Sequence, residues 1–281
     1  MFQERIEFIN RLAVEAGQLT LAGFGKCDQM PKDGQEYDIA TEYDLKSERL
    51  VRERIAEAFG EPVLGEEGGL LGDPEVARHH VWIVDPIDGT FNYQRGVPTY
   101  AVSIAYCQEG VPVCGAVYLP VLGRLYYAAQ GEGAFMRQDG STVPEPLRVS
   151  KERDLNKLFI GFAGNGLYRL TAACEREQIP RRCLRVIMAA AQDLALIASG
   201  RMDLYLHDSL YLWDCAAGDI LLREAGAPGL FDYQRVPIFP HYLERELDGG
   251  NPNGFTLVAT SSYDLFEEPA RRILTSAGYQ L

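Results

Sequence analysis

The apolar residues of the N-terminal half follow first a helical and then a strand period. Apolar positions recur every three to four residues over residues 2–24 and 44–59, which predicts two amphipathic helices. A short apolar run at 81–84, bounded by polar residues, predicts a buried strand. Three longer apolar runs, separated by glycines, predict the strands of an antiparallel meander at 99–107, 111–119 and 125–130. A Gly-Glu-Gly turn at 131–133 is expected to close this meander.

The C-terminal half mixes short strands with helices. A polar, proline-bearing stretch at 141–153 predicts the junction between two halves, 1–145 and 146–281. Beyond it, apolar patterns predict strands at 158–162, 204–206 and 255–260, and helices at 186–199, from Asp214 to Gly226, and through Leu274. The glycines and prolines of residues 232–254 predict an irregular segment, which we interpret as a surface loop, with an oligomer contact as the alternative. Strands grouped in this way favour layered α/β sheets over a Rossmann or barrel plan.

Composition limits the partners of this chain. Its 281 residues, 47% hydrophobic and 24% charged, are enough for one large domain or two joined halves. The net charge of −13 argues against nucleic-acid and anionic-membrane partners, which need basic surfaces. No apolar stretch is long enough to span a bilayer, and an amphipathic helix opens the chain, so we expect a cytoplasmic protein. The six cysteines lack paired spacing and are expected to be reduced.

The motif Asp-Pro-Ile-Asp-Gly-Thr at 85–90 directly follows the predicted strand at 81–84. Two carboxylates this close repel each other at neutral pH unless a cation lies between them, and carboxylates are ligands that Mg²⁺ prefers. Gly89 lets the backbone approach a ligand, and the N–H groups of Gly89 and Thr90 could face a phosphate at a helix start. The alternative is an ordinary Asp-rich turn.

Three further groups of carboxylates occupy comparable positions. Glu66 and Glu67 follow a short apolar run, Asp214 falls in the first turn of a predicted helix, and Asp44 opens another helix. Taken singly, each group is explained by a helix N-terminal carboxylate or a solvated turn.

Taken together and in this order, the four motifs resemble the inositol monophosphatase family, which are Mg²⁺-dependent, lithium-sensitive phosphomonoesterases. The resemblance rests on the segment 38–44, Gly-Glu-Glu at 65–67, Asp-Pro-Ile-Asp-Gly-Thr at 85–90 and Trp-Asp-Cys-Ala-Ala-Gly at 213–218. It implies an αβαβα sandwich, a homodimer and a small phosphorylated substrate, for which inositol monophosphate is the leading candidate.

The resemblance also implies the roles of single residues and two to three Mg²⁺ ions per site. Metal ligands would be Glu66, Asp85, the backbone carbonyl of Ile87, Asp88 and Asp214. Gly89 and Thr90 would bind phosphate, and Thr90, Glu66 and Asp44 would activate the attacking water in an in-line displacement. The alcohol would contact Asp88, Ala190, His207 and Asp214.

Two departures from the family pattern fall on the alcohol side. Met188 stands where relatives have glycine, and His207 stands where inositol-specific relatives have a glutamate that binds sugar hydroxyls. An imidazole cannot reproduce a carboxylate's two acceptor oxygens. Other substrates therefore stay open, namely 3'-phosphoadenosine 5'-phosphate, histidinol phosphate or a sugar phosphate, as does a regulatory protein that acts through protein contacts.

Overall fold

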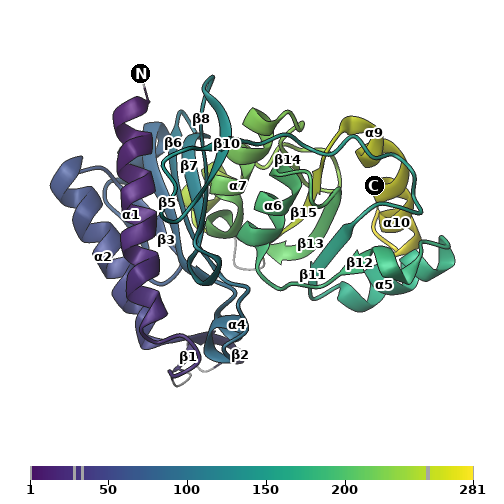
Figure 1. Cartoon of the computed structure of the whole chain (residues 1–281), viewed down its shortest axis with the longest axis horizontal. Coiled ribbons are helices and arrows are strands. Elements are labelled where there is room, and N and C mark those ends of the chain that lie inside the picture. The colour runs from purple at the N-terminus through teal and green to yellow at the C-terminus, as the bar shows by residue number, and fades with distance from the viewer. Residues whose placement is uncertain (1, 28–29, 33–34, 251–253, 281) are drawn as a thin grey trace.

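The computed structural model describes residues 2–27, 30–32, 35–250 and 254–280. Its helices and sheets alternate in five layers, which run from left to right in Figure 1. Two helices cover the outer face of a first sheet, two more separate that sheet from a second one, and short helices cover the far face of the second sheet. The αβαβα sandwich is therefore confirmed.

The first sheet has eight strands in the order β10-β9-β8-β7-β6-β5-β3-β4. All neighbours are antiparallel except β3 and β5. Its strands are β3 (Val63–Gly65), β4 (Gly69–Leu71), β5 (His80–Asp88), β6 (Ala101–Gln108), β7 (Val111–Leu119), β8 (Arg124–Ala129), β9 (Gly133–Gln138) and β10 (Glu145–Pro146). The predicted meander is present, but the Gly-Glu-Gly turn does not close it, because β9 and β10 continue the sheet. The division into two halves at 145/146 stays a prediction.

The outer layer consists of α1 (Gln3–Leu21) and α2 (Glu42–Ala58). The predicted inward face of α1 is buried through Ile6, Ile9, Ala13 and Ala16, which join one apolar cluster with strands β5 to β8. The apolar positions of the helix predicted at 44–59 are not all buried: Val51 and Ile55 of α2 are buried, but Leu45 is 49% exposed.

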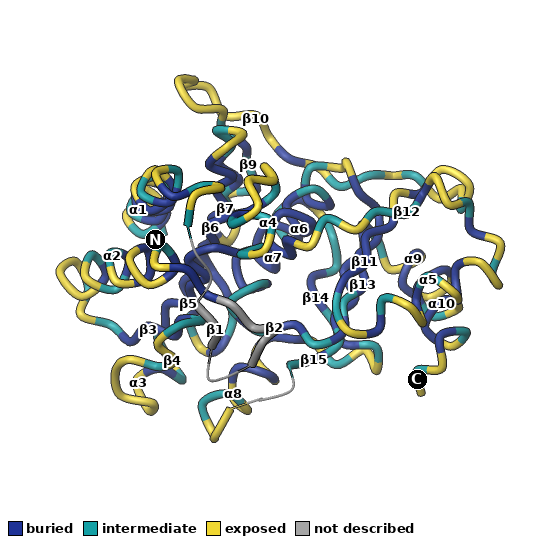
Figure 2. The backbone as a smooth tube through the Cα atoms, turned by 90° about the horizontal axis from the view of Figure 1, so that it is seen from below, coloured by how far each residue is buried: buried dark blue, intermediate teal, exposed yellow. Residues whose placement is uncertain are grey.

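The middle layer consists of α6 (Ala190–Ala198) and α7 (Leu212–Ala225). Both lie in the dark blue interior of Figure 2, whereas α2 and α3 carry yellow exposed positions. Its apolar pattern predicts a single buried face for α7, but the helix is buried nearly all round, because β6 and β7 pack on one side of it and α6 on the other. The helix predicted from residue 186 begins only at Ala190, after a residue of positive φ, Met188.

The second sheet has five strands in the order β12-β11-β13-β15-β14. They are β11 (Ile160–Gly164), β12 (Leu184–Arg185), β13 (Leu204–Leu210), β14 (Leu230–Phe231) and β15 (Phe255–Thr260). Strands β12, β11 and β13 are parallel, and β15 pairs antiparallel with β13 and β14. The far face is covered by α5 (Leu167–Arg176), α9 (Tyr263–Leu265), a π-helical turn (Phe266–Ala270) and α10 (Arg271–Ser276).

The remaining elements connect these layers. They are β1 (Met30–Lys32), β2 (Gln35–Ala40), α3 (Pro74–His79), α4 (Thr90–Gln94), α8 (His241–Leu247) and two 3₁₀ turns, Pro120–Leu122 and Arg181–Cys183. The described part of the loop predicted at 232–254 thus contains a helix, α8, which buries Tyr242 and Leu243, while residues 251–253 lie outside the described residues. Across the described ranges, no helix combines the length and apolar character needed to cross a membrane. All six cysteines are free thiols, as expected.

Candidate active site

The end of β5 places Asp85 and Asp88 beside each other. Two residues three apart in a regular strand point to opposite faces of the sheet. Here the pairing of β5 with β6 shifts register between Asp85 and Asp88, and such an irregularity turns side chains that would otherwise diverge. The strand predicted at 81–84 is longer than expected, because β5 continues through Asp85 to Asp88.

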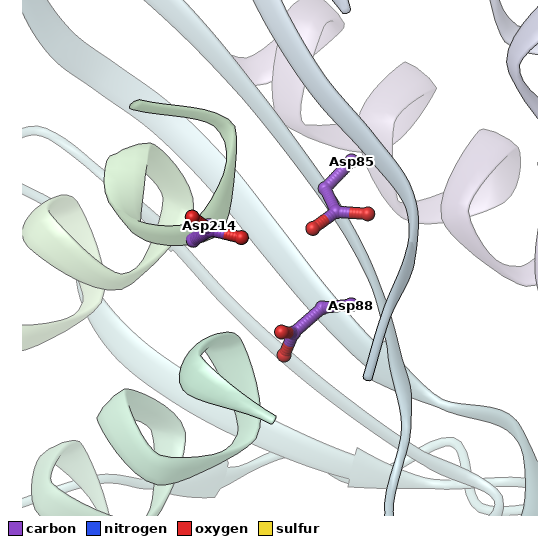
Figure 3. Close-up of side chains that lie close together, drawn as sticks. All are labelled: Asp85, Asp88 and Asp214. Atoms are coloured by element: carbon purple, nitrogen blue, oxygen red, sulfur yellow. The ribbon is translucent and has the colours of Figure 1, made fainter. Parts of the chain in front are cut away.

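Asp214 completes an acidic cluster with these two residues. It lies in the first turn of α7, where its carboxylate accepts the N–H of Tyr211 at 2.7 Å. One oxygen from each of Asp85, Asp88 and Asp214 lies within 4.8 Å of the others, and Figure 3 shows the three side chains facing a common space. Strand β5 and helix α7 together therefore build a group that could hold a metal ion.

Electrostatics shows that this cluster fits a hard cation. Burial raises the pKa of Asp85 and Asp214 well above the usual range, and the neighbouring carboxylates raise both further. The pKa of Asp88 is raised to about 7, again mainly by burial. Within the described residues, Oδ2 of Asp85 is buried and accepts no hydrogen bond. Ionising three such carboxylates is costly without a bound cation, and oxygen ligands of this kind suit Mg²⁺.

Asp88 also ties the middle layer to the first sheet. Its two oxygens accept the N–H groups of Ala190 at 2.9 Å and Ala191 at 2.8 Å. These N–H groups belong to the first turn of α6, which has no intrahelical partners for them. Ala190, predicted on the alcohol side, thus lies beside Asp88 and holds it in place.

Gly89 and Thr90 form the turn from β5 into α4. Gly89 has φ 90°, and a side chain there would approach the carbonyl oxygens of Met188 and Thr99 to 3.1 Å, so glycine is required. The Thr90 hydroxyl lies 3.2 Å from Oδ1 of Asp44 and 3.1 Å from the Ile87 carbonyl oxygen, and can donate to either. The predicted link between Thr90 and Asp44 is present.

Asp44 is fully buried and has a second role in the helix start. Its Oδ2 accepts the backbone N–H of Thr41 at 2.8 Å and the Thr41 hydroxyl at 2.5 Å, which caps α2. The ordinary helix-cap interpretation and the link to Thr90 therefore both hold.

The turn that carries Glu66 is held by a residue that sequence reasoning missed. Glu48 on α2 is buried and accepts the N–H groups of Glu67 at 2.8 Å and Gly68 at 2.9 Å, while Arg52 donates to it at 2.8 Å. A side chain at Gly65 would lie 2.6 Å from this carboxylate. The available signal was a glutamate on the helix face that also carries Val51 and Ile55.

Asn92 is the second residue that the sequence did not single out. Its side-chain amide donates to the carbonyls of Thr99 at 2.9 Å, Ile187 at 2.8 Å and Met188 at 3.2 Å. It therefore fastens the segment before α6 to α4, the helix that begins at Thr90. The only signal was an amide residue two positions after Thr90.

A cavity of about 300 Å³ opens beside the acidic cluster. His207 lines it, and burial lowers the pKa of this imidazole to about 4, so the ring is neutral at pH 7. Nδ1 of His207 has no hydrogen-bond partner among the described residues. The lining residues are Glu66, Asp88, Gly89, Thr90, Phe91, Ala163, Met188, Ala189, Ala190, Tyr205, His207, Ser209, Leu210, Tyr211 and Asp214.

The predicted residues divide into two groups around this cavity. Glu66, Asp88, Gly89, Thr90, Ala190, His207 and Asp214 line it, whereas Asp44, Asp85 and Ile87 are buried and do not. Asp208, next to His207, turns away from the cavity and accepts the Gly166 N–H at 2.6 Å and the Tyr279 hydroxyl at 2.8 Å.

A five-layered fold with a buried acidic cluster beside a glycine-threonine turn defines a class of phosphatases. The chain belongs to the inositol monophosphatase family, whose model matches residues 1–244. It is 41% identical over 197 residues to an inositol-1-monophosphatase of Mycobacterium leprae, covering 68% of this chain and 67% of that one. It is 35% identical over 218 residues to a histidinol-phosphatase of Mycobacterium tuberculosis, covering 76% and 82%.

The solved structures agree with the sequence relatives. The Thermotoga maritima IMPase superposes with a TM-score of 0.79 at 27% identity, covering 98% of this chain and 100% of that one. Fold and family together identify the protein as a phosphoric monoester hydrolase.

Proposed function

We propose that the protein hydrolyses a small phosphate monoester with Mg²⁺ as its cofactor, and that inositol monophosphate is the first substrate to test. The observation that carries this proposal is the convergence of Asp85, Asp88 and Asp214 within 4.8 Å, next to a cavity lined by Gly89 and Thr90. A phosphate bound at that turn would lie against the carboxylates that could hold the metal.

In this proposal, each residue of the site has a separate role in binding or catalysis. The N–H groups of Gly89 and Thr90 bind phosphate, and the Thr90 hydroxyl, held by Asp44, orients the attacking water. Two to three Mg²⁺ ions, held by Glu66, Asp85, the Ile87 carbonyl, Asp88 and Asp214, would supply Lewis acidity that lowers the pKa of water and stabilises developing charge. Asp88 is oriented for this by the start of α6.

The cavity favours a substrate with a single phosphate. None of the described residues that line it is a lysine or an arginine, so a second phosphate would find no cationic side chain there. This argues against 3'-phosphoadenosine 5'-phosphate. Histidinol phosphate is the second candidate, because a histidinol-phosphatase is among the relatives and the neutral His207 replaces the sugar-binding glutamate.

Three further properties belong to this proposal. A homodimer and inhibition by lithium are what the family resemblance implies, and a cytoplasmic location is the expectation from the sequence.

Phosphate release from a substrate panel tests the proposal. We would assay inositol 1-phosphate, histidinol phosphate, a sugar phosphate and 3'-phosphoadenosine 5'-phosphate, each with Mg²⁺ and with EDTA. We expect Mg²⁺-dependent release from the esters with one phosphate, inositol 1-phosphate foremost. Release that persists in EDTA would contradict the metal assignment, and no release from any ester would favour the regulatory alternative.

A further inference from the structure

Met188 has a backbone conformation that is unusual for its side chain. Five described residues other than glycine have positive φ, namely Glu109, Gln178, Met188, Ser209 and Arg235. Met188, at φ 62°, is the only one of them with an apolar side chain. Left-handed backbone is unfavourable for any residue with a Cβ, and such strained positions concentrate at functional sites. Both Met188 and Ser209 line the cavity described above.

The conformation of Met188 is imposed by the site around it. The Asn92 amide holds the carbonyl oxygens of Ile187 and Met188, at 2.8 and 3.2 Å. Two residues later, the N–H of Ala190 donates to Asp88 at 2.9 Å. Glycine at position 188 would satisfy the same backbone without strain. The backbone therefore does not explain the methionine, and its side chain needs another explanation.

The side chain of Met188 is available to a ligand. It is 49% exposed although it lines the cavity. Phe91, the second residue of α4, lines the same cavity and is 50% exposed. Because Asn92, the neighbour of Phe91, binds the Met188 carbonyl, these two apolar residues come from segments that touch. The rest of the described protein covers only about half of each side chain, so both keep apolar surface that a bound molecule could bury.

The other contacts of the cavity divide by chemistry. Glu66, Asp88 and Asp214 are its only charged lining residues among those described, and they belong to the proposed metal and phosphate region. The remaining polar groups include His207, which is neutral at pH 7, and the Tyr205 hydroxyl. Away from the carboxylates, the cavity thus offers apolar surface and uncharged hydrogen-bonding groups.

We propose that Met188 and Phe91 form an apolar wall that contacts the alcohol part of the substrate and determines specificity. The wall would favour phosphate monoesters whose alcohol carries a ring with an apolar face next to the phosphate, over esters of open-chain polyols. This inference rests on the proposed function, because it assigns the alcohol side of the same site. The strain at Met188 persists, in this account, because the side chain contributes to substrate binding.

Met188→Gly is the most direct test, because glycine suits φ 62° and the variant is expected to fold. The substrates are benzyl phosphate and glycerol 1-phosphate, two primary alkyl esters that differ in the ring. In the wild type we expect a higher kcat/KM for benzyl phosphate. In tight pockets, one methylene changes the discrimination between substrates by roughly 10- to 200-fold. Because Met188 and Phe91 are half exposed, we expect the ratio of kcat/KM for benzyl phosphate to kcat/KM for glycerol 1-phosphate to fall at least about fivefold. Adding Phe91→Ala should lower it further.

Gln178→Gly is the matched control. Gln178 has a similar φ of 59°, is exposed and does not line the cavity, so the ratio should stay at the wild-type value. Either of two results would contradict the proposed wall: a Met188→Gly variant that retains turnover with an unchanged ratio of the two kcat/KM values, or a wild type that prefers glycerol 1-phosphate.

A binding arm separates this inference from the proposed function. If the wild type releases phosphate from no ester, the proposed function fails. The proposal of an apolar wall is then tested by calorimetric titration of the protein with benzylphosphonate and propylphosphonate in the presence of Mg²⁺. Weaker binding of the benzyl compound alone in Met188→Gly supports the wall. Equal loss for both compounds, or no loss, contradicts it.

Discussion

At the scale of single residues, the site uses side chains that also hold the fold together. Asp44 caps α2 through Thr41 and binds the Thr90 hydroxyl. Asp88 accepts two N–H groups from α6 and also belongs to the acidic cluster. A substitution at such a residue changes stability and chemistry together, so the informative variants are those that remove one role only.

Thr90→Ala removes the hydroxyl and leaves the backbone of the turn. We expect kcat to fall by about 10² to 10⁴, the usual size of a lost proton-transfer or water-orienting group, while KM changes little. Steady-state kinetics at saturating Mg²⁺ measures this. Thr90→Ser is the control and should keep most of the rate, because it retains the hydroxyl. An effect on KM alone would make Thr90 only a binding residue.

His207 gives the protein a dependence of stability on pH. Its pKa is lowered from 6.5 to about 4 in the folded state, mainly by burial. The folded state therefore resists protonation, and the stability associated with neutral His207 is present above pH 6.5 and is lost as the pH falls towards 4. Urea unfolding from pH 7 to 4 should show a wild-type slope up to about 1.4 kcal/mol per pH unit steeper than that of His207→Gln. Equal slopes would place a solvated imidazole at this position.

At the scale of elements, the turn between β3 and β4 depends on α2. Glu48 and Arg52 on that helix bind the backbone around Gly65–Gly69, the turn that presents Glu66 to the cavity. The helix is thereby a support for a predicted metal ligand, at a distance in sequence of about twenty residues.

Glu48→Gln should weaken metal activation more than substrate binding. The amide offers one acceptor oxygen where the carboxylate accepts from two N–H groups and Arg52, so one backbone donor loses its partner. Partners that orient metal ligands typically contribute 10- to 100-fold, so we expect the Mg²⁺ activation constant to rise by about that factor. Mg²⁺ titrations of activity measure it.

Glu53→Gln on the same helix is the control for this variant. Its partner is Arg49 in an exposed ion pair, which contributes about 0–1 kcal/mol. If both variants shift the Mg²⁺ constant equally, Glu48 acts only through the stability of α2.

Elements with one buried face were predictable from sequence, and those with unusual surroundings were less so. The face of α1 followed from its period because one side meets the sheet and the other meets solvent. Periodicity could not show that α7 is buried nearly all round, since its second contact, α6, comes from elsewhere in the chain. Nor could it place the start of α6, because Asn92 and the positive φ of Met188 fix it.

At the scale of the whole molecule, packing of the layers builds the site. Asp85 and Asp88 come from the first sheet, Asp214 and Ala190 from the middle layer, and His207 from the second sheet. Motif order in the sequence pointed to most of these residues through the family resemblance. The supporting contacts of Glu48 and Asn92 were not predictable, because each joins segments that only the folded layers bring together.

The net charge of −13 is compatible with an anionic substrate in this account. An acidic protein would repel an anionic ester, but carboxylates that hold Mg²⁺ become locally attractive to phosphate. The central claim is therefore that this acidic cluster works as a metal site for phosphate ester hydrolysis.

The turnover of Asp85→Asn at saturating Mg²⁺ tests that claim most directly. The amide retains an oxygen to accept the Ile87 N–H, which Asp85 Oδ1 accepts at 3.0 Å, so the fold should survive, as circular dichroism would verify. It lacks the negative charge with which Asp85 would help to hold the metal ions. We predict a loss of kcat of at least about 100-fold on inositol 1-phosphate, more than the effect of removing a supporting partner. A folded Asp85→Asn protein that kept about a tenth of the wild-type kcat or more would contradict the account.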